Sequence, residues 1–262
     1  MKRLSLCAIT VVLVALAMRT PTKHVAAQEQ SSVPRVSSGD IDPDAMAALN
    51  KMGSYLRSLK AFQVEAVTTR DEVLEDGQQI QFDSHVDLLA SMPDHLRAEV
   101  ENARRHQFYF FDGKNFTLFA QRVNYYATVP APPTIAKLSD HLYEKFGIEM
   151  PLEDLFLWGT SRSKIGEIKS ATTVGPSQVG GVTCEHFAFR QDGLDWQVWI
   201  QQGDYPLPRR LVLTTQTDDA RPKYSSEFTW NLAPSFNDAA FVFDPPKDAQ
   251  RITIATQAGD KQ

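Results

Sequence analysis

The residues best suited to nucleophilic chemistry are Cys184 and His186, which stand two positions apart in a segment that alternates like a β-strand. Side chains two positions apart share a strand face but stand about 7 Å from each other. A thiol nucleophile needs a base within hydrogen-bond reach. This spacing is too wide for a direct bond, so the pair is not predicted to carry catalysis.

Metal and cofactor chemistry have no better candidates. The histidines beyond the N-terminal segment are scattered, and none stands at metal-ligand spacing on one helix: His85, His95, His106, His141 and His186. The chain also lacks a G-x-S-x-G elbow, a phosphate-binding loop and a G-x-G-x-x-G fingerprint. The sequence therefore predicts no catalytic residue, no metal, no cofactor and no enzymatic activity.

The most informative segment is residues 132–158, a helical insert in a chain that otherwise alternates like strands. Thr134 is placed to cap a first helix, Gly147 to end it, and Pro151 to begin a second helix that ends at Trp158. The first helix carries one apolar stripe: Ile135, Leu138, Leu142 and Phe146. Two amphipathic helices that cover a sheet can enclose a cavity between helices and sheet. The same stripe also fits the alternative, ordinary core packing of a helix on a sheet.

The stripe sets how firmly such a lid closes. Burying one large apolar side chain is worth about 1.5–3 kcal/mol, so four of them contribute roughly 6–12 kcal/mol as an upper bound. An open state is therefore expected to be rare unless an apolar guest replaces the contact.

The elements around the insert place the chain in the α+β class. A helix beginning at Asp42 has apolar residues at spacings of three and four, and about ten antiparallel strands follow, interrupted by the insert. The segment Gln107–Phe111 is aromatic on both faces, which predicts a strand covered on both faces. A last short strand is predicted at Phe241–Phe243, before Pro245 and Pro246.

The N-terminus has the pattern of an export signal. Residues 1–27 have a positive start, an apolar run from Leu4 to Met18 and small residues before Gln28. The run is shorter than the about 20 residues that span a bilayer. An uncleaved membrane anchor is the alternative. Residues 28–41 are then a flexible leader, 42–250 a single domain and 251–262 a loose tail.

The net charge restricts the classes of binding partner, and the cysteine content restricts disulfide formation. Removing residues 1–27 removes four basic residues and no acid, which moves the net charge from −5 to −9. Such a chain is not predicted to bind nucleic acid or, by charge, an anionic lipid surface. Removal also leaves Cys184 as the one cysteine, so no intrachain disulfide forms, and this thiol is expected to be buried and inert.

Several motifs together resemble a known family. They are Phe110–Lys114, Tyr125–Ala127, Pro151–Leu155, Trp196–Ile200, Leu207–Arg210 and Phe241–Pro246. Over residues 42–250 the chain resembles the bacterial predicted periplasmic proteins called domain of unknown function 2092. The last motifs are also similar to the wider superfamily of outer-membrane lipoprotein carriers, LolA and LolB.

The resemblance implies a curved antiparallel half-barrel, LolA-like, covered by the N-terminal helix and the two-helix insert, with a cavity between sheet and helices. It implies a periplasmic protein that binds a hydrophobic ligand, a lipid or an acyl chain, without catalysis. The candidate lid and cavity residues are Phe110, Tyr126, Ile135, Leu138, Leu142, Phe146, Leu155, Phe156 and Trp158. A lipid or lipidated protein and an inner-membrane partner are the expected partners.

Two alternatives stay open beside this interpretation. The superfamily also implies an envelope sensor or interaction module related to periplasmic stress regulators. An enzyme of unrecognised type would instead show a cluster of converging polar residues inside the cavity.

Overall fold

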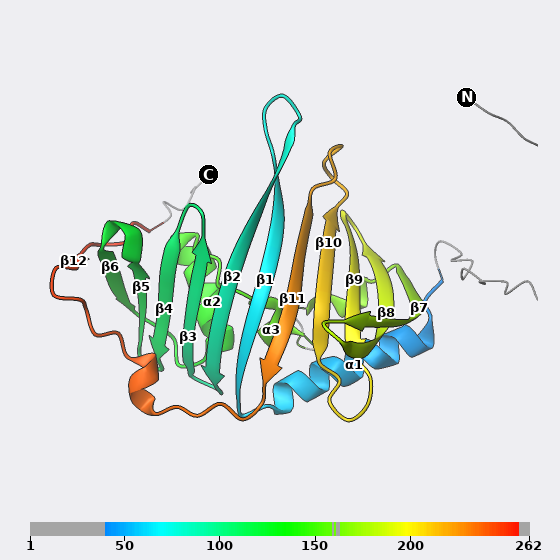
Figure 1. Ribbon diagram of the computed structural model, residues 1–262, viewed down its shortest axis with the longest axis horizontal. Coiled ribbons are helices and arrows are strands. Elements are labelled where there is room, and N and C mark those ends of the chain that lie inside the picture. The colour runs from blue at the N-terminus through cyan, green and yellow to red at the C-terminus, as the bar shows by residue number, and fades with distance from the viewer. Residues whose placement is uncertain (1–39, 159, 161–162, 257–262) are drawn as a thin grey trace, which may run out of the picture. The chain divides into compact units, whose positions relative to one another are not determined.

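The computed structural model describes residues 40–158, 160 and 163–256, which belong to one compact unit (Figure 1). The predicted signal peptide, the leader as far as residue 39, and residues 257–262 of the predicted tail lie outside the described residues. The predicted boundaries of signal, leader, domain and tail therefore stay predictions.

A single sheet of twelve strands forms the centre of this unit. The strands are β1 (Ala61–Val73), β2 (Gln79–Ser91), β3 (His95–Asn102), β4 (His106–Asp112), β5 (Asn115–Ala120), β6 (Tyr125–Pro130), β7 (Ser170–Val179), β8 (Val182–Gln191), β9 (Leu194–Gln201), β10 (Pro208–Thr215), β11 (Lys223–Asn231) and β12 (Gln250–Arg251). Their order is β12-β6-β5-β4-β3-β2-β1-β11-β10-β9-β8-β7, and every pair is antiparallel except β12 with β6. Because β12 and β7 end this order without pairing to each other, the sheet is open.

The α+β class is confirmed, with two more strands than the ten expected. The strand β7 had no clear signal in the sequence, because Gly175 and Pro176 interrupt it and a register shift lies between Thr173 and Gly175. The strand predicted at Phe241–Phe243 is wrong. Residues 238–241 form a 3₁₀ turn instead, capped by the Asn237 side chain, which accepts a hydrogen bond from the Ala239 amide.

Within the described residues three α-helices accompany the sheet: α1 (Pro43–Ser58), α2 (Ile135–Phe146) and α3 (Asp154–Leu157). Asp42 caps α1 and Thr134 caps α2, each accepting a hydrogen bond from a backbone amide of the first turn. Gly147 ends α2 with a φ of 65°, the left-handed conformation that glycine adopts without strain. The predicted caps of α1 and α2 are confirmed, since each depends on residues within one turn.

The second helix of the insert is shorter than predicted. It begins at Asp154 rather than at Pro151 and makes a single turn. Leu152 has a φ of 52°, which lies outside the right-handed helical region. A helix cannot run through that residue, so residues 147–153 form an irregular linker between α2 and α3.

The helices cover one face of the sheet, and α2 and α3 lie behind it in the view of Figure 1. This inner face carries the main core, in which Leu49 and Met52 of α1 are fully buried together with Val64 and Leu88 of the sheet. Along β1 the inner face changes character, from apolar side chains between Phe62 and Ala66 to Thr68 and Arg70. One end of the inner face is therefore apolar and the other polar.

The opposite, outer face of β4–β6 carries a second aromatic cluster. Phe110, Phe119 and Tyr126 each lie within 5.1–5.4 Å of the Phe243 ring, centroid to centroid. Tyr109 and Phe111 point the other way and are buried in the main core. The prediction that this aromatic strand is covered on both faces is confirmed, with the C-terminal segment as the outer cover.

Candidate functional site

A cavity of about 690 Å³ lies at the polar end of the inner face. One wall is the linker after α2, residues 147–153, together with Asp154 at the start of α3. The other is the sheet, which contributes polar groups beside apolar ones: Thr68, Arg70, Ser84, Val86, Val100, Gln107, Tyr109, Leu118, Leu194, Leu213 and Tyr224. The volume lies within the range of about 300–1,000 Å³ typical of ligand sites.

The linker is held in place from the α2 side. The Ile148 amide donates to the Leu142 carbonyl at 3.1 Å, which continues the helix end into the linker. The Ser139 hydroxyl of α2 donates to the Glu153 carboxylate at 2.5 Å. Ser139 is 1% exposed, so this charge-assisted bond joins the buried side of α2 to the cavity wall.

Asp154, at the start of α3, is the most perturbed acid of the site. Burial, with the neighbouring carboxylate of Glu153 as a smaller cause, raises the pKa of Asp154 from 3.8 to about 6. Its carboxylate makes no hydrogen bond or ion pair with any residue in the described part of the chain. A desolvated carboxylate without a partner in a cavity wall is a typical mark of a functional site.

Two tyrosines face the same cavity. Burial raises the pKa of Tyr224, with smaller opposed effects from Asp154, which raises it, and Arg70, which lowers it. The Tyr224 hydroxyl also accepts a hydrogen bond from the Ser226 hydroxyl at 2.8 Å. Burial likewise raises the pKa of Tyr109. The sheet wall thus presents neutral phenols opposite the acidic linker.

A smaller hollow of about 210 Å³ adjoins the cavity and shares Asp154, Leu194 and Leu213 with it. Its wall is mostly apolar and includes Trp158 and Trp196, whose rings meet edge to face with centroids 5.5 Å apart. The site therefore has two parts, a wide polar one and a small apolar one, which meet at Asp154.

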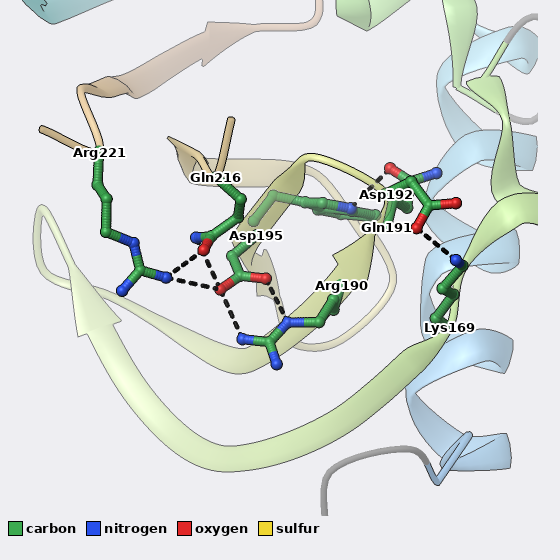
Figure 2. Close-up of polar contacts among 8 residues, drawn as sticks. Lys169, Arg190, Gln191, Asp192, Asp195, Gln216 and Arg221 are labelled. Carbon is green, nitrogen blue, oxygen red and sulfur yellow. Dashed lines mark hydrogen bonds and ion pairs between the residues drawn. The ribbon is translucent and has the colours of Figure 1, made fainter. Parts of the chain in front are cut away.

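A polar network fixes the rim of the small hollow (Figure 2). Gln191 accepts a hydrogen bond from the Trp196 indole at 3.1 Å and donates one to the Lys164 carbonyl at 2.8 Å. Beside it, Asp195 accepts two bonds from Arg190, at 2.6 and 2.7 Å, and lies 3.9 Å from Arg221. These bonds hold the end of the β8–β9 hairpin against the chain that follows the insert.

The structure separates the nine candidate ligand residues by position. Most of those on the insert are packed into the core and line neither hollow: Ile135, Leu138, Leu142, Phe146, Leu155 and Phe156. Trp158 is the candidate that reaches a hollow, the smaller of the two. The apolar stripe of α2 thus anchors the insert, and the cavity lies beside it at the linker.

Phe110 and Tyr126 lie on the outer face, in contact with Phe243. These two cavity candidates therefore line neither of the two hollows on the inner face. The strand β4 is aromatic on both faces, so its sequence pattern could not tell which aromatic residues point inward. The packing of the main core, which contains Tyr109 and Phe111, decides which of these aromatic residues point inward.

Sequence reasoning missed Asp154, Tyr224 and Arg70 as members of the site. A signal was present in β1, where Thr68 and Arg70 continue the inward positions of the apolar residues before them. An apolar strand face that turns polar at one end indicates a place where the core stops. Asp154 had no such signal, because its burial depends on residues far away in the chain.

The candidates for nucleophilic chemistry have other partners. The Cys184 thiol is buried, lies 3.5 Å from the Val182 carbonyl, and has a pKa raised by that burial. The His186 ring stacks on Trp199 at 3.9 Å and contacts the Gln197 amide at 3.0 Å. Within the described residues, no group of three or more His, Cys, Asp or Glu could hold a metal ion.

Another hollow, of about 480 Å³, lies on the outer face and is lined by several acids. Three of these acids have partners: Glu99 lies 2.7 Å from His106, Asp87 accepts from Gln63 at 2.9 Å, and Glu227 lies 3.6 Å from Arg210. The charges of these three are satisfied within the protein, unlike that of Asp154. Across the described residues, no helix has the length and apolar character to cross a membrane.

Comparison with known proteins gives a family and a set of weak structural likenesses. The family described as "Predicted periplasmic protein (DUF2092)" matches residues 45–255. No curated protein sequence matches the chain.

Three solved structures illustrate the likeness. An uncharacterized conserved protein from Thermus thermophilus shares 13% identity, covering 80% of this chain and 99% of that one at a TM-score of 0.44. LprF from Mycobacterium bovis shares 14%, with 81% and 100% covered at 0.43. A LolA superfamily protein from Nitrosomonas europaea shares 12%, with 76% and 97% covered at 0.37. At these scores no ligand or partner is carried over to this chain.

Proposed function

This chain belongs to the DUF2092 family of predicted periplasmic proteins, and on that premise we propose that it is an exported protein that binds a hydrophobic ligand without catalysis. The ligand is a lipid or another molecule with an acyl chain. The cavity of about 690 Å³ between the sheet and the linker is the observation that carries this proposal.

The lining of the site refines the ligand class. The wide part has polar groups from both walls, while the small part is walled mainly by tryptophan, leucine and isoleucine side chains. An amphiphile matches both parts, with its apolar chain in the small hollow and its polar head in the wide one. Burial of apolar surface supplies the affinity, and the polar groups set the orientation.

The polar lining also bears on the enzyme alternative. Asp154, Glu153, Tyr109 and Tyr224 converge on the cavity, as an enzyme would require. A carboxyl with a pKa near 6 is suited to proton transfer. The hydroxyl groups in the lining make no hydrogen bond to Asp154, and no metal-binding cluster lies among the described residues, so binding is the function that the site supports better.

Native mass spectrometry of the purified protein, stripped of lipid and then exposed to a lipid extract, tests the proposal. We expect one bound amphiphile per chain. Leu194→Trp places a large ring where the two parts of the site meet and should reduce the bound fraction about tenfold. Leu74→Trp adds the same ring to the exposed β1–β2 turn and should leave binding unchanged. Folded wild-type protein that retains no lipid would contradict the proposal.

Export rests on residues 1–27, which we propose to be a cleaved signal. The mass of the protein recovered from the periplasmic fraction should correspond to a chain beginning at Gln28. Full-length protein held in the membrane fraction would support the alternative of an uncleaved anchor.

A sensor or interaction module remains a separate prediction, which crosslinking in intact cells to an inner-membrane partner would test.

A further inference from the structure

Among the lining residues that the two parts of the site share, Asp154 is the charged one. It lines both the wide cavity and the small hollow, together with Leu194 and Leu213. Both of those neighbours are apolar, so a ligand that spans the two parts passes the Asp154 carboxylate. This carboxylate also lacks a partner within the described residues.

The charges around Asp154 restrict the chemistry of such a ligand. Glu153, the last residue of the linker, adds a second negative charge beside it and is bonded to Ser139 of α2. Tyr224 of β11 offers a phenol. Arg70, on the neighbouring strand β1, has a lowering effect on the pKa of that phenol. Lys164, at the rim of the small hollow, lies 3.8 Å from Glu167. An anionic head at this point would meet two carboxylates.

We propose that Asp154 binds a primary ammonium group of the ligand, whose apolar chain lies in the small hollow against Trp158 and Trp196. An ammonium offers three hydrogen-bond donors and a positive charge, which complements the two negative carboxylates. A neutral hydroxyl would offer one donor and no charge. This inference rests on the proposed function and names the head group of its ligand.

The ammonium has two sources, a simple long-chain amine or a zwitterionic lipid that carries a phosphate beside the amine. Three basic residues also line the wide cavity, Arg70, Arg105 and Lys223, and a phosphate would bind there. Both sources share the contact to Asp154, and the experiment separates them by comparing two amines.

Calorimetric titration of the delipidated full mature chain with decylamine, decan-1-ol and decanoate, below their micelle concentrations at pH 7.5, tests the inference. The three probes share a chain and differ in the head. Decylamine should bind about tenfold more tightly than decan-1-ol, the factor that corresponds to one charge-assisted hydrogen bond. Decanoate should bind most weakly. Lysophosphatidylethanolamine binding more tightly than decylamine would assign the head to a zwitterionic lipid, and the reverse to a free amine.

The variant Asp154→Asn should remove the preference for decylamine over decan-1-ol. Asp219→Asn removes the same charge from an exposed loop and should keep the preference, which separates a specific contact from general attraction to an acidic protein. Lowering the pH from 7.5 to 4.5 protonates Asp154 while the alkyl ammonium stays charged, so the preference should fall in the wild type and in Asp219→Asn, which both keep Asp154.

The outcomes distinguish this inference from the proposed function. If decan-1-ol binds as tightly as decylamine, or if Asp154→Asn keeps the preference, the ammonium contact is wrong while the hydrophobic site stands. If decanoate binds best, the head group lies at the basic side chains instead. If none of the probes binds to folded protein, the proposed function fails with it.

Discussion

The two halves of the insert are built differently. In α2, Ile135, Leu138 and Leu142 are completely buried and the helix ends are capped. In the linker and α3, the backbone passes through a left-handed Leu152, the helix has a single turn, and Asp154 lies beside a cavity without a partner among the described residues. A regular amphipathic helix is thus followed at once by an irregular acidic wall.

The difference shows how a cavity is attached to a stable sheet. The buried stripe of α2 supplies the free energy that holds the insert in place. The linker can then keep an open volume and an unpaired charge, both of which lower the stability of the fold. Stability and the proposed binding therefore belong to neighbouring segments, and substitutions in each should have different effects.

The largest expected effect is the loss of stability in Leu138→Ala. Truncating a completely buried leucine removes apolar burial and leaves a void, which costs about 2–5 kcal/mol of unfolding free energy. Urea unfolding monitored by circular dichroism measures it. The exposed Lys137→Ala should change stability by less than about 0.5 kcal/mol. Equal effects of the two would mean that α2 does not anchor the insert.

Asp154→Asn should act in the opposite direction. The pKa of Asp154 is higher in the folded chain, about 6 against 3.8, so its ionisation disfavours the fold. The penalty is absent below pH 3.8, grows as the pH rises to about 6, and reaches at most about 3 kcal/mol above that. The value is an upper limit because the side chain retains partial solvent access.

Urea midpoints at pH 7.5 and pH 4.5 check this sign. The asparagine variant should be more stable than the wild type at pH 7.5, and the gain should shrink towards pH 4.5 as the wild-type carboxyl takes up its proton. A variant that is less stable than the wild type at pH 7.5 would show that the carboxylate has a stabilising partner, and the contrast between the two halves would disappear.

The smallest expected effect concerns the bond that joins the halves. Ser139→Ala removes the hydroxyl that donates to Glu153, and should cost about 1.5 kcal/mol, the lower end for a bond to a charged group. A double-mutant cycle with Glu153→Gln isolates the coupling between the two side chains. A coupling near zero would mean that the linker is held in place by its backbone alone.

Parts of the fold followed from local pattern. The caps at Asp42 and Thr134 and the end of α2 at Gly147 all match the structure. Each depends on residues within about four positions. The strand β7 and the turn at residues 238–241 did not follow local pattern, because their hydrogen bonds and packing depend on neighbours distant in sequence.

The candidate site was predicted less completely than the fold. The insert was identified as its cover, and the stripe of α2 was expected to face the sheet, which it does. The ligand candidates were chosen for being apolar, whereas Glu153, Asp154 and Tyr224 line the cavity. Apolar periodicity identifies the residues that pack into the core. The cavity lies where this packing ends, so its lining residues do not follow the apolar pattern.

The sequence by itself determined that helices would cover one face of a strand-rich sheet, because periodicity and capping are properties of short segments. Only the tertiary structure decided that Phe110 and Tyr126 point away from the insert, and that Asp154 is enclosed without a partner among the described residues. The face to which each strand residue points, and the burial of the Asp154 carboxylate, are both set by packing against segments that are distant in sequence. The choice of side chain at position 154 is local, but its pKa of about 6 comes from everything packed around it.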